Sequence, residues 1–477
     1  MFRIKSNSIL TVAAISTGIY SCNVPKLVSK DEDKTVPQSF VGARDTTAHP
    51  LPAWRSFFTD PKLVSLIDTA IAHNQDLQMT LQEIEIARNE IRWRKAAYLP
   101  NVSLGAGAGV DKVARYTPRG AADEMSEITP GQKVPNPIAD LNVMAKASWE
   151  VDIWKKLRNK KQAAVQRYLA TVEGKNYVLT NLIAEVADTY YDLIALDNQL
   201  EIVRQNIKLQ KNGLETVKAQ KAAARATELA VQKFQAEVLH SQSLEYDFMQ
   251  QVAATQNRLY LLLGRYPDHI DRSADSFLST VPPIVYSGVP AALLSNRPDI
   301  QQAEHELAAA KLDVKAARAE FFPSLSINAG IGLQAFNPRY LATLPESLIA
   351  SLVGDLAGPL INRNAIKAEY FSSGARQVKA VYNYQRSILN AYLEVSTQLS
   401  QINNLEESYA LKSKQVAALT TSIDIAGDLF KSARADYLEV LTTQRDVLEA
   451  KLELVETKRA QLQSVVRVYH DLGGGWQ

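Results

Sequence analysis

The chain has 477 residues, of which 46% are hydrophobic and 22% charged, and its formal net charge at pH 7 is +2. This length and apolar content suffice for two or three domains with sizeable buried surface. Lys, Arg, Asp and Glu are interspersed rather than grouped in blocks, so the composition gives no support for a nucleic-acid-binding surface.

The N-terminus has the pattern of an export signal. Arg3 and Lys5 precede an apolar run from Ile9 to Tyr20, which is too short to span a bilayer. Cys22, the only cysteine in the chain, follows where a bacterial lipoprotein signal has its lipid-bearing residue. The pattern predicts a lipoprotein signal peptide at 1–21, a covalent lipid on Cys22 and a lipidated N-terminal tether at 22–52. The alternative is an incidental cysteine beside a cleavage site.

The rest of the chain is a tandem duplication. Asp76 precedes Pro100 by the same 24 residues that separate Asp299 from Pro323, an offset of 223 between the copies. Further along, three short motifs recur at an offset of 209: Glu185-Val186, Ala224-Arg225-Ala226 and Leu263-Gly264 return as Glu394-Val395, Ala433-Arg434-Ala435 and Leu472-Gly473. The architecture therefore uses one unit twice, and we predict a first structural repeat at 53–282 and a second at 283–477.

Each repeat contains two segments that alternate apolar and small or polar residues. The predicted strands lie at about 101–111 and 141–152 in the first repeat, and at about 324–334 and 346–356 in the second. A strand of about ten residues with one apolar face has the length to cross a bilayer when tilted. On the opposite face of the first strand, Gly105, Gly107 and Gly109 are predicted to face a pore. The alternative is a small soluble sheet.

Long helices account for most of the remainder. The predicted helices lie at about 62–98, 157–221 and 227–264 in the first repeat, and at about 297–321, 362–430 and 436–472 in the second. Hydrophobic residues recur every seven positions in both copies, which is coiled-coil patterning: Leu179, Val186, Leu193, Leu200, Ile207 and Leu214, then Ile388, Val395, Ile402, Tyr409, Val416 and Ile423. A helix of about 65 residues extends on the order of 100 Å, so it must run in an extended antiparallel bundle.

Four strands cannot close a barrel by themselves. An open sheet edge facing lipid leaves unpaired backbone groups that cost several kcal/mol each. If the strands cross a membrane, copies of the chain must therefore share a barrel, with 8, 12 or 16 strands in a dimer, trimer or tetramer.

Several motifs, in order along the duplicated frame, are similar to those of the TolC-like outer-membrane efflux proteins, and within them the lipid-anchored group of the OprM, CusC and NodT type. The segments that carry the resemblance cover nearly the whole chain: Trp54-Arg55-Ser56-Phe57-Phe58-Thr59-Asp60-Pro61, Ala147-Ser148-Trp149-Glu150-Val151-Asp152, Arg297-Pro298-Asp299-Ile300, Ala317-Arg318-Ala319-Glu320-Phe321-Phe322-Pro323-Ser324, Ala357-Gly358-Pro359-Leu360, Tyr437-Leu438-Glu439-Val440-Leu441, Gln444-Arg445 and Leu472-Gly473-Gly474-Gly475-Trp476.

The resemblance implies an α+β membrane protein. Long antiparallel helical hairpins would form a periplasmic tunnel, and four strands per chain would contribute to a twelve-stranded transmembrane β-barrel in a homotrimer. It also implies lipid anchoring in the bacterial outer membrane and two protein partners, a periplasmic adaptor (membrane fusion) protein and an inner-membrane transporter of the RND type.

The expected function is passive conduction of small toxic compounds through the outer membrane as part of a tripartite efflux system. The alternatives are a conduit for secreted polypeptides and, in another class, a lipid-anchored coiled-coil tether without a pore. The six histidines are scattered, and none forms a metal-ligand pair at helical spacing. We therefore expect no enzymatic activity, no catalytic residue, no metal and no cofactor apart from the lipid on Cys22.

Candidate functional residues lie near the turns between the long helices. Asp424 and Asp428 are four residues apart, so they share a helix face shortly before the second turn, with Lys431 and Arg434 close by. The two carboxylates either pair with these basic residues or, in a trimer, meet near the axis as a charged constriction of the kind found in cation-selective channels. The resemblance implies that the periplasmic aperture lies in this region, and these four residues are the candidates for it. The alternative for either carboxylate is an ordinary solvated helix face.

The turns themselves are where the resemblance places adaptor docking. Their small residues would let another helical hairpin approach closely, and two arginines would offer polar contacts. The alternative is ordinary packing of a tight turn. The candidates are Ala223, Ala224, Arg225 and Ala226 in the first turn and Ala433, Arg434 and Ala435 in the second.

Overall fold

The computed structural model describes residues 24–28, 30–41, 50–272, 277–280, 282, 288–358, 363–432 and 434–476. The predicted signal peptide at 1–21 and Cys22 lie outside these residues, as does Ala433. The chain forms two compact units. The first takes its described residues from Met1–Asp31, Glu85–Tyr168 and His305–Val381, and the second from Glu32–Ile84, Leu169–Glu304 and Tyr382–Gln477. Each unit therefore draws on both sequence repeats.

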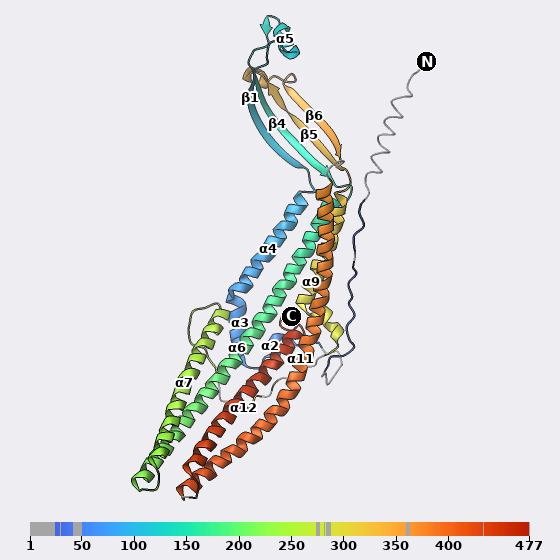
Figure 1. Cartoon of the computed structure of the whole chain (residues 1–477). Coiled ribbons are helices and arrows are strands. Elements are labelled where there is room, and N and C mark those ends of the chain that lie inside the picture. Colours follow the sequence, from blue (N-terminus) through green and yellow to red (C-terminus); the bar gives the residue numbers. More distant parts are fainter. Residues whose placement is uncertain are drawn as a thin grey trace. The chain divides into compact units, whose positions relative to one another are not determined.

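The secondary structure follows the duplication (Figure 1). The elements of the first half are α2 (Trp54–Phe57), α3 (Pro61–His73), α4 (Gln75–Ala96), β1 (Asn101–Asp111), α5 (Pro118–Met125), β2 (Glu127–Thr129), β3 (Gln132–Lys133), β4 (Ile138–Val151), α6 (Lys156–Ala222) and α7 (Glu228–Leu262). Those of the second half are η1 (Pro290–Ala292), α8 (Leu293–Asn296), α9 (Pro298–Ala319), β5 (Ser324–Ala335), α10 (Pro338–Leu341), β6 (Leu348–Ala357), α11 (Asn364–Lys431) and α12 (Tyr437–Asp471).

In the first unit, four strands form one antiparallel sheet in the order β1-β4-β5-β6. The central pair, β4 and β5, joins the two repeats, with Val151 opposite Leu325 and Leu141 opposite Ala335. The outer strands β1 and β6 are the edges of this sheet. The halves of the duplication thus share one sheet, which the periodicity of each half alone did not indicate.

The sheet has one apolar and one polar face over β1 and β4. Val102 lies opposite Ala147, whereas Gly107 lies opposite Asn142. Because directly opposed residues point to the same face of an antiparallel pair, the small residues of β1 share a face with the polar residues of β4. A Cβ on Gly107 would lie 2.9 Å from Asn142 Oδ1, so glycine leaves room there for the amide.

The predicted helix at 62–98 is wrong as a single element. It is two helices, α3 and α4, separated by Asn74, whose φ of −62° and ψ of 125° are extended. Asn74 Oδ1 accepts a hydrogen bond from the Leu77 backbone N–H at 3.0 Å, while Asn74 Nδ2 donates to the Leu262 carbonyl oxygen at 3.0 Å. The side chain thus caps the start of α4 and holds the end of α7, which explains the break.

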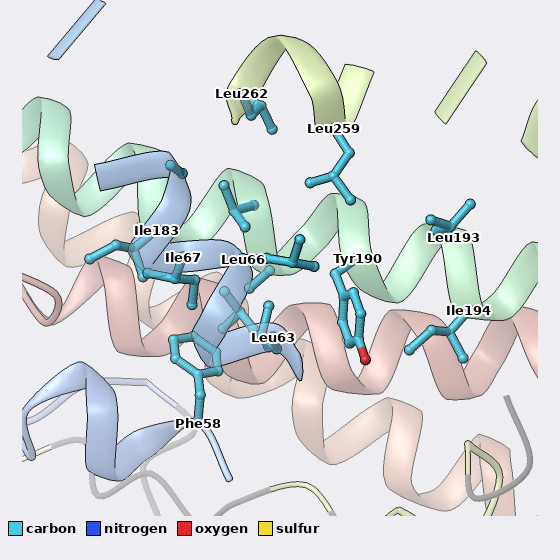
Figure 2. Close-up of a cluster of buried hydrophobic side chains, with 14 of the residues drawn as sticks. Phe58, Leu63, Leu66, Ile67, Ile183, Tyr190, Leu193, Ile194, Leu259 and Leu262 are labelled. Carbon is cyan, nitrogen blue, oxygen red and sulfur yellow. The ribbon is translucent and has the colours of Figure 1, made fainter. Parts of the chain in front are cut away.

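The heptad positions of α6 lie in the core of the second unit. Val186 and Leu193 are fully buried, and they pack in a cluster that includes Tyr190, Leu63 and Ile67. Figure 2 shows Leu63, Leu66 and Ile67 of α3 in this cluster, together with side chains of α6 and of the end of α7. Burial of the heptad residues stabilises the long helix α6, as the seven-residue pattern predicts.

The predicted tether packs on the protein over part of its length. In the first unit, Leu27 contacts a cluster that includes Phe321. In the second unit, Phe40 is buried and its ring stacks on Tyr392 with 5.6 Å between centroids. Lys34 forms an ion pair of 2.6 Å with Glu304. These described residues form a strap fixed by apolar and charged contacts. Among the described helices, none combines the length and apolar content that crossing a bilayer requires.

Candidate functional site

The turns between the long helices share one backbone hydrogen bond at equivalent positions in the two repeats. The Arg225 N–H donates to the Gln220 carbonyl oxygen at 2.8 Å, and the Arg434 N–H donates to the Leu429 carbonyl oxygen at 2.8 Å. These bonds span six residues, as in the Schellman ending of a helix. Each pair of donors and acceptors is related by the offset of 209, so the duplication preserved both turns.

The first turn contains a residue in a costly conformation. Ala224 has a φ of 59°, in the left-handed region that glycine adopts most readily. The Thr227 side chain then accepts a hydrogen bond from the Ala230 N–H and caps α7. A tight, capped turn holds its neighbours in a defined position.

Among the described docking residues, equivalent positions of the two turns have the same exposure. Ala223, Ala224 and Arg225 are exposed in the first turn. Arg434 is also exposed, and the equivalent residues Ala226 and Ala435 are both half-buried. The side chains of Arg225 and Arg434 are therefore accessible to another protein.

An apolar cluster joins the two hairpins just behind these turns. It includes residues from α6, α7 and α12, with Ala226, Ala426, Phe430 and Tyr437 packed against it. The signal for it was the continuation of the heptad of α6 from Leu214 to Val217. Its buried members are Leu214, Val217, Ala230, Val231, Phe234, Val238, Val440 and Leu441.

Asp424 and Asp428 are exposed on α11, about two turns and one turn, respectively, before its end. Lys431 Nζ lies 3.2 Å from Asp428 Oδ1, with the two side chains 73% and 80% exposed. An ion pair so open to water contributes little to stability. These charges are therefore available to act on ions or on another chain.

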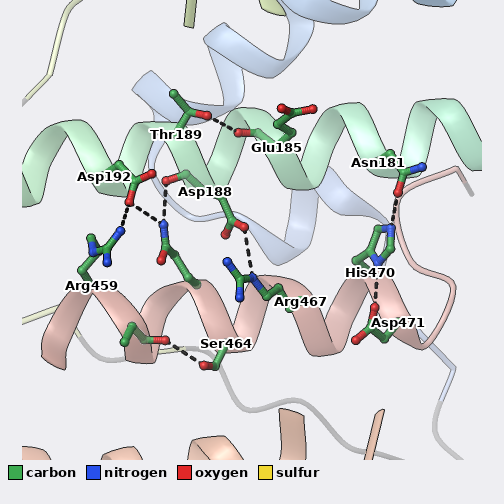
Figure 3. A network of polar contacts seen from close by, with 12 residues as sticks. Asn181, Glu185, Asp188, Thr189, Asp192, Arg459, Ser464, Arg467, His470 and Asp471 are labelled. Carbon is green, nitrogen blue, oxygen red and sulfur yellow. Dashed lines mark hydrogen bonds and ion pairs between the residues drawn. The ribbon is translucent and has the colours of Figure 1, made fainter. Parts of the chain in front are cut away.

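A second polar arrangement lies between α6 and α12 and was not predicted (Figure 3). Arg459 forms an ion pair with Asp192, and Arg467 Nε lies 3.3 Å from Asp188 Oδ2. Gln463 Nε2 donates to Asp192 Oδ1 at 2.7 Å and to the Asp188 carbonyl oxygen at 3.0 Å. Each helix contributes side chains spaced four residues apart, which was the available signal. Their pairing across the chain was not visible in the sequence.

Asp188 is the unusual group in this arrangement. Burial raises the pKa of its carboxyl to about 6, and the nearby Arg467 opposes the shift. Asp188 Oδ1 is buried and has no hydrogen-bond partner. Elsewhere among the described residues, no group of three or more His, Cys, Asp and Glu is placed to hold a metal ion.

Comparison with protein families identifies the chain. The model of the family described as outer membrane efflux protein matches residues 66–265 and 289–474. The chain belongs to the outer membrane efflux protein family. Both halves of the duplication are included in the match. The family that the sequence motifs predicted is therefore confirmed.

Relatives of this efflux protein match over nearly its full length. The toluene efflux pump outer membrane protein TtgF of Pseudomonas putida is 31% identical over 440 residues, covering 89% of this chain and 85% of the relative. The cation efflux system protein CusC of Escherichia coli is 28% identical over 451 residues, covering 92% of this chain and 93% of the relative.

Solved structures share the fold of this efflux protein. A crystal structure of CusC has a TM-score of 0.81 with 25% identity, covering 94% of this chain and 99% of that one. The open state of the MtrE outer membrane channel of Neisseria gonorrhoeae has a TM-score of 0.81 with 22% identity, covering 95% and 99%. The predicted fold, a duplicated set of long helical hairpins with four strands per chain, is confirmed.

Proposed function

We propose that three copies of the chain form an outer-membrane channel that passively conducts small toxic compounds. An inner-membrane pump of the RND type delivers them through a periplasmic adaptor. The carrying observation is an apolar stripe on α7 that has no partner within the described chain, although the equivalent stripe on α12 is buried.

The duplication gives each residue of the α7 stripe a counterpart on α12. Leu239 is 58% exposed and Tyr246 is 71% exposed, whereas their counterparts Leu448 and Val455 are 7% and 0% exposed. Leu448 belongs to a buried cluster with Leu200, Val203 and Ile207 of α6 and Phe248 of α7. In the second repeat, the equivalent of α6 is α11. The α11 helix of a second copy is therefore the partner that would cover the α7 stripe.

Covering α7 of one copy with α11 of the next is a head-to-tail assembly, and the first unit also supports it. Strands β1 and β6 are the edges of the sheet, and α4 exposes Ile86 and Trp93 seven residues apart. Pairing β6 of one copy with β1 of the next satisfies the backbone groups that lipid would leave unpaired. A head-to-tail interface generates a ring when its rotation closes. Three copies give the twelve-stranded barrel expected from the resemblance.

In this assembly, the carboxylates of Asp424 and Asp428, with Lys431 and Arg434, would form the periplasmic aperture. The turns around Arg225 and Arg434 would receive the adaptor, because they combine exposed guanidinium groups with small residues. The lipid on Cys22 would anchor the strap in the outer membrane.

Conduction requires no bond chemistry, so we propose that the protein is not an enzyme. The names of its relatives refer to different cargoes, among them cations, toluene and pyoverdine. A shared channel architecture with different cargoes is expected if the pump, and not the channel, selects the compound that is exported. Small molecules are thus the expected cargo class.

Electron microscopy and conductance of Tyr246→Glu test the proposal. A charge in the stripe should abolish three-fold particles and channel conductance. The matched control is Leu229→Glu, because Leu229 and its counterpart Leu438 are both exposed. This control should keep the trimers. Trimers that survive Tyr246→Glu would contradict the proposed interface, and wild-type trimers without conductance would contradict the channel function.

A further inference from the structure

The α6–α12 seam, defined here as Asp188 and Asp192 of α6 with Arg459, Gln463 and Arg467 of α12, connects the two repeats. Its ion pairs and hydrogen bonds join residues separated by about 270 positions in the chain (Figure 3). Both hairpins begin or end in helices that pass through this seam. A change in its strength therefore acts on the relative positions of the two hairpins.

Asp188 is placed where its charge is poorly compensated. One carboxylate oxygen, Oδ2, faces Arg467 Nε at 3.3 Å, which is long for a charge-assisted bond. The other, Oδ1, is buried without a partner. An ionised carboxylate with an unsatisfied buried oxygen is costly, and either a proton or access to water relieves that cost.

Other charged groups around Asp188 come from three helices. On α6, Asp192 is close enough to oppose ionisation of Asp188. Tyr191 is half-buried, and its own pKa is raised, first by burial and then by the charges of Asp60 and Asp188. On α12, Arg467 and His470 favour ionisation of Asp188. On α7, Arg258 pairs with Glu185 at 2.8 Å.

His470 lies at the end of the same seam. Its Nε2 is 2.6 Å from Asn181 Oδ1 on α6, and its Nδ1 is 2.8 Å from Asp471 Oδ1. Figure 3 shows it in line with Arg459 and Arg467 along α12. The basic groups of α12 thus face α6 over several turns, with Asp188 in the middle.

We propose that the α6–α12 seam is a pH-sensitive latch, which tightens when Asp188 takes up a proton and loosens when Asp188 is ionised. Loosening lets water reach the unpaired oxygen and lets α12 move away from α6. The further consequence, that acid keeps the two hairpin turns together and the aperture narrow, rests on the proposed channel function.

The direction follows from linkage. The pKa of Asp188 is raised to about 6 in the closed seam, whereas a hydrated carboxyl returns to its ordinary value near 3.8. Between these two values the closed seam binds more protons than the open one, so acid favours closure. The opening equilibrium should increase about tenfold from pH 5 to pH 8 and change little at higher pH.

Thiol labelling of Val466→Cys measures this opening. Val466 is 2% exposed on α12 and belongs to the buried cluster that contains Val186 and Tyr190 of α6, so a cysteine there reacts when the seam opens. The full-length trimer is labelled with a maleimide between pH 5 and pH 8. Each rate is divided by that of a separate Glu449→Cys variant, whose site is exposed on the same helix, to remove the pH dependence of the thiol itself. The chain without an introduced cysteine gives the background labelling.

The latch predicts a normalised rate that increases about tenfold over this range. Adding Asp188→Asn should hold the rate at the slow, acid value at every pH, because the amide cannot ionise. Adding Glu185→Gln should preserve the increase, since Glu185 is exposed and paired with Arg258. A flat wild-type rate, or an increase that survives Asp188→Asn, would overturn the proposal.

Conductance of the same trimers in planar bilayers separates the latch from the channel. A higher open probability at pH 8 than at pH 5, abolished by Asp188→Asn, would support regulation of the aperture. Conductance independent of pH beside a pH-dependent labelling rate would overturn the regulatory role. Absence of conductance at every pH would contradict the channel function, while the labelling result would still decide whether the latch exists.

Discussion

Arg297 Nη1 donates a hydrogen bond of 3.0 Å to the backbone carbonyl oxygen of Asp471, at the end of α12. In the first repeat, Asn74 Nδ2 makes the equivalent bond to the carbonyl oxygen of Leu262 at the end of α7. The duplication thus preserved a hydrogen bond from the residue that precedes α4 or α9 to the end of the hairpin in the same repeat. The chemistry of the link diverged, from a neutral amide to a buried guanidinium.

Arg297→Ala should destabilise the protein by about 1–3 kcal/mol, because it leaves the carbonyl group of the buried residue Asp471 without its donor. Arg297 is 4% exposed and pairs with Asp299 and Glu394, both at 2.8 Å. Burial alone would lower its pKa, but these carboxylates raise it above the ordinary value. Denaturant titration of the detergent-solubilised protein measures the loss. Arg258→Ala, which removes an exposed pair, should cost at most about 1 kcal/mol. Equal losses of stability in Arg297→Ala and Arg258→Ala would contradict the conclusion that the buried interactions of Arg297 contribute more.

Local periodicity was enough to predict the long helices and their buried faces. Val186 and Leu193 were predicted as heptad positions, and both are fully buried. The break at Asn74 was not predictable in the same way, since helix-forming residues continue on both sides. It depends on a carbonyl group 188 residues away in the sequence.

For the candidate site, too, local spacing was predictable from the sequence, whereas contacts between distant segments were not. The spacing of Asp424, Asp428 and Lys431 placed their charges close together near the end of α11, and the structure pairs Asp428 with Lys431. The spacing of Asp188 and Arg467 gave no such indication, because a pair 279 residues apart is set by how α6 and α12 pack. Likewise, each strand was visible as an alternating pattern, but the pairing of β4 with β5 follows from the tertiary fold.

Gly264→Ala and Gly473→Ala should each destabilise the protein by at least about 2 kcal/mol. Both glycines have positive φ, at 64° and 92°. A Cβ would lie 2.2 Å from the His73 carbonyl oxygen in the first case and 2.3 Å from that of Asn296 in the second. Thermal unfolding followed by circular dichroism checks the loss.

Gly427→Ala is the matched control for these two substitutions. This glycine lies within α11, and a Cβ there would meet nothing within 4 Å. Alanine should therefore stabilise the helix by about 0.5–1 kcal/mol. If all three variants changed stability in the same direction, the close backbone approach would not be the cause.

Ala224→Gly should stabilise the first turn by about 0.5–1 kcal/mol, because it removes the strain of alanine at a φ of 59°. Urea denaturation of the wild type and variant measures the gain. Ala219→Gly, in the exposed last turns of α6, should instead cost about 1 kcal/mol. A loss at both positions would show that Ala224 is not strained in solution.

Replacing both Asp424 and Asp428 by Asn should reduce the cation preference of the proposed channel. In a trimer, carboxylates near the axis attract cations at the narrowest point, as in other charged constrictions. We expect the permeability ratio of K⁺ to Cl⁻ to fall about tenfold, equivalent to about 1.4 kcal/mol of lost attraction. The reversal potential across a KCl gradient in planar bilayers measures this ratio. Glu449→Gln, on the exposed surface of α12, should leave it unchanged. An unchanged ratio in the double variant would remove these aspartates from the aperture and favour an ordinary solvated helix face.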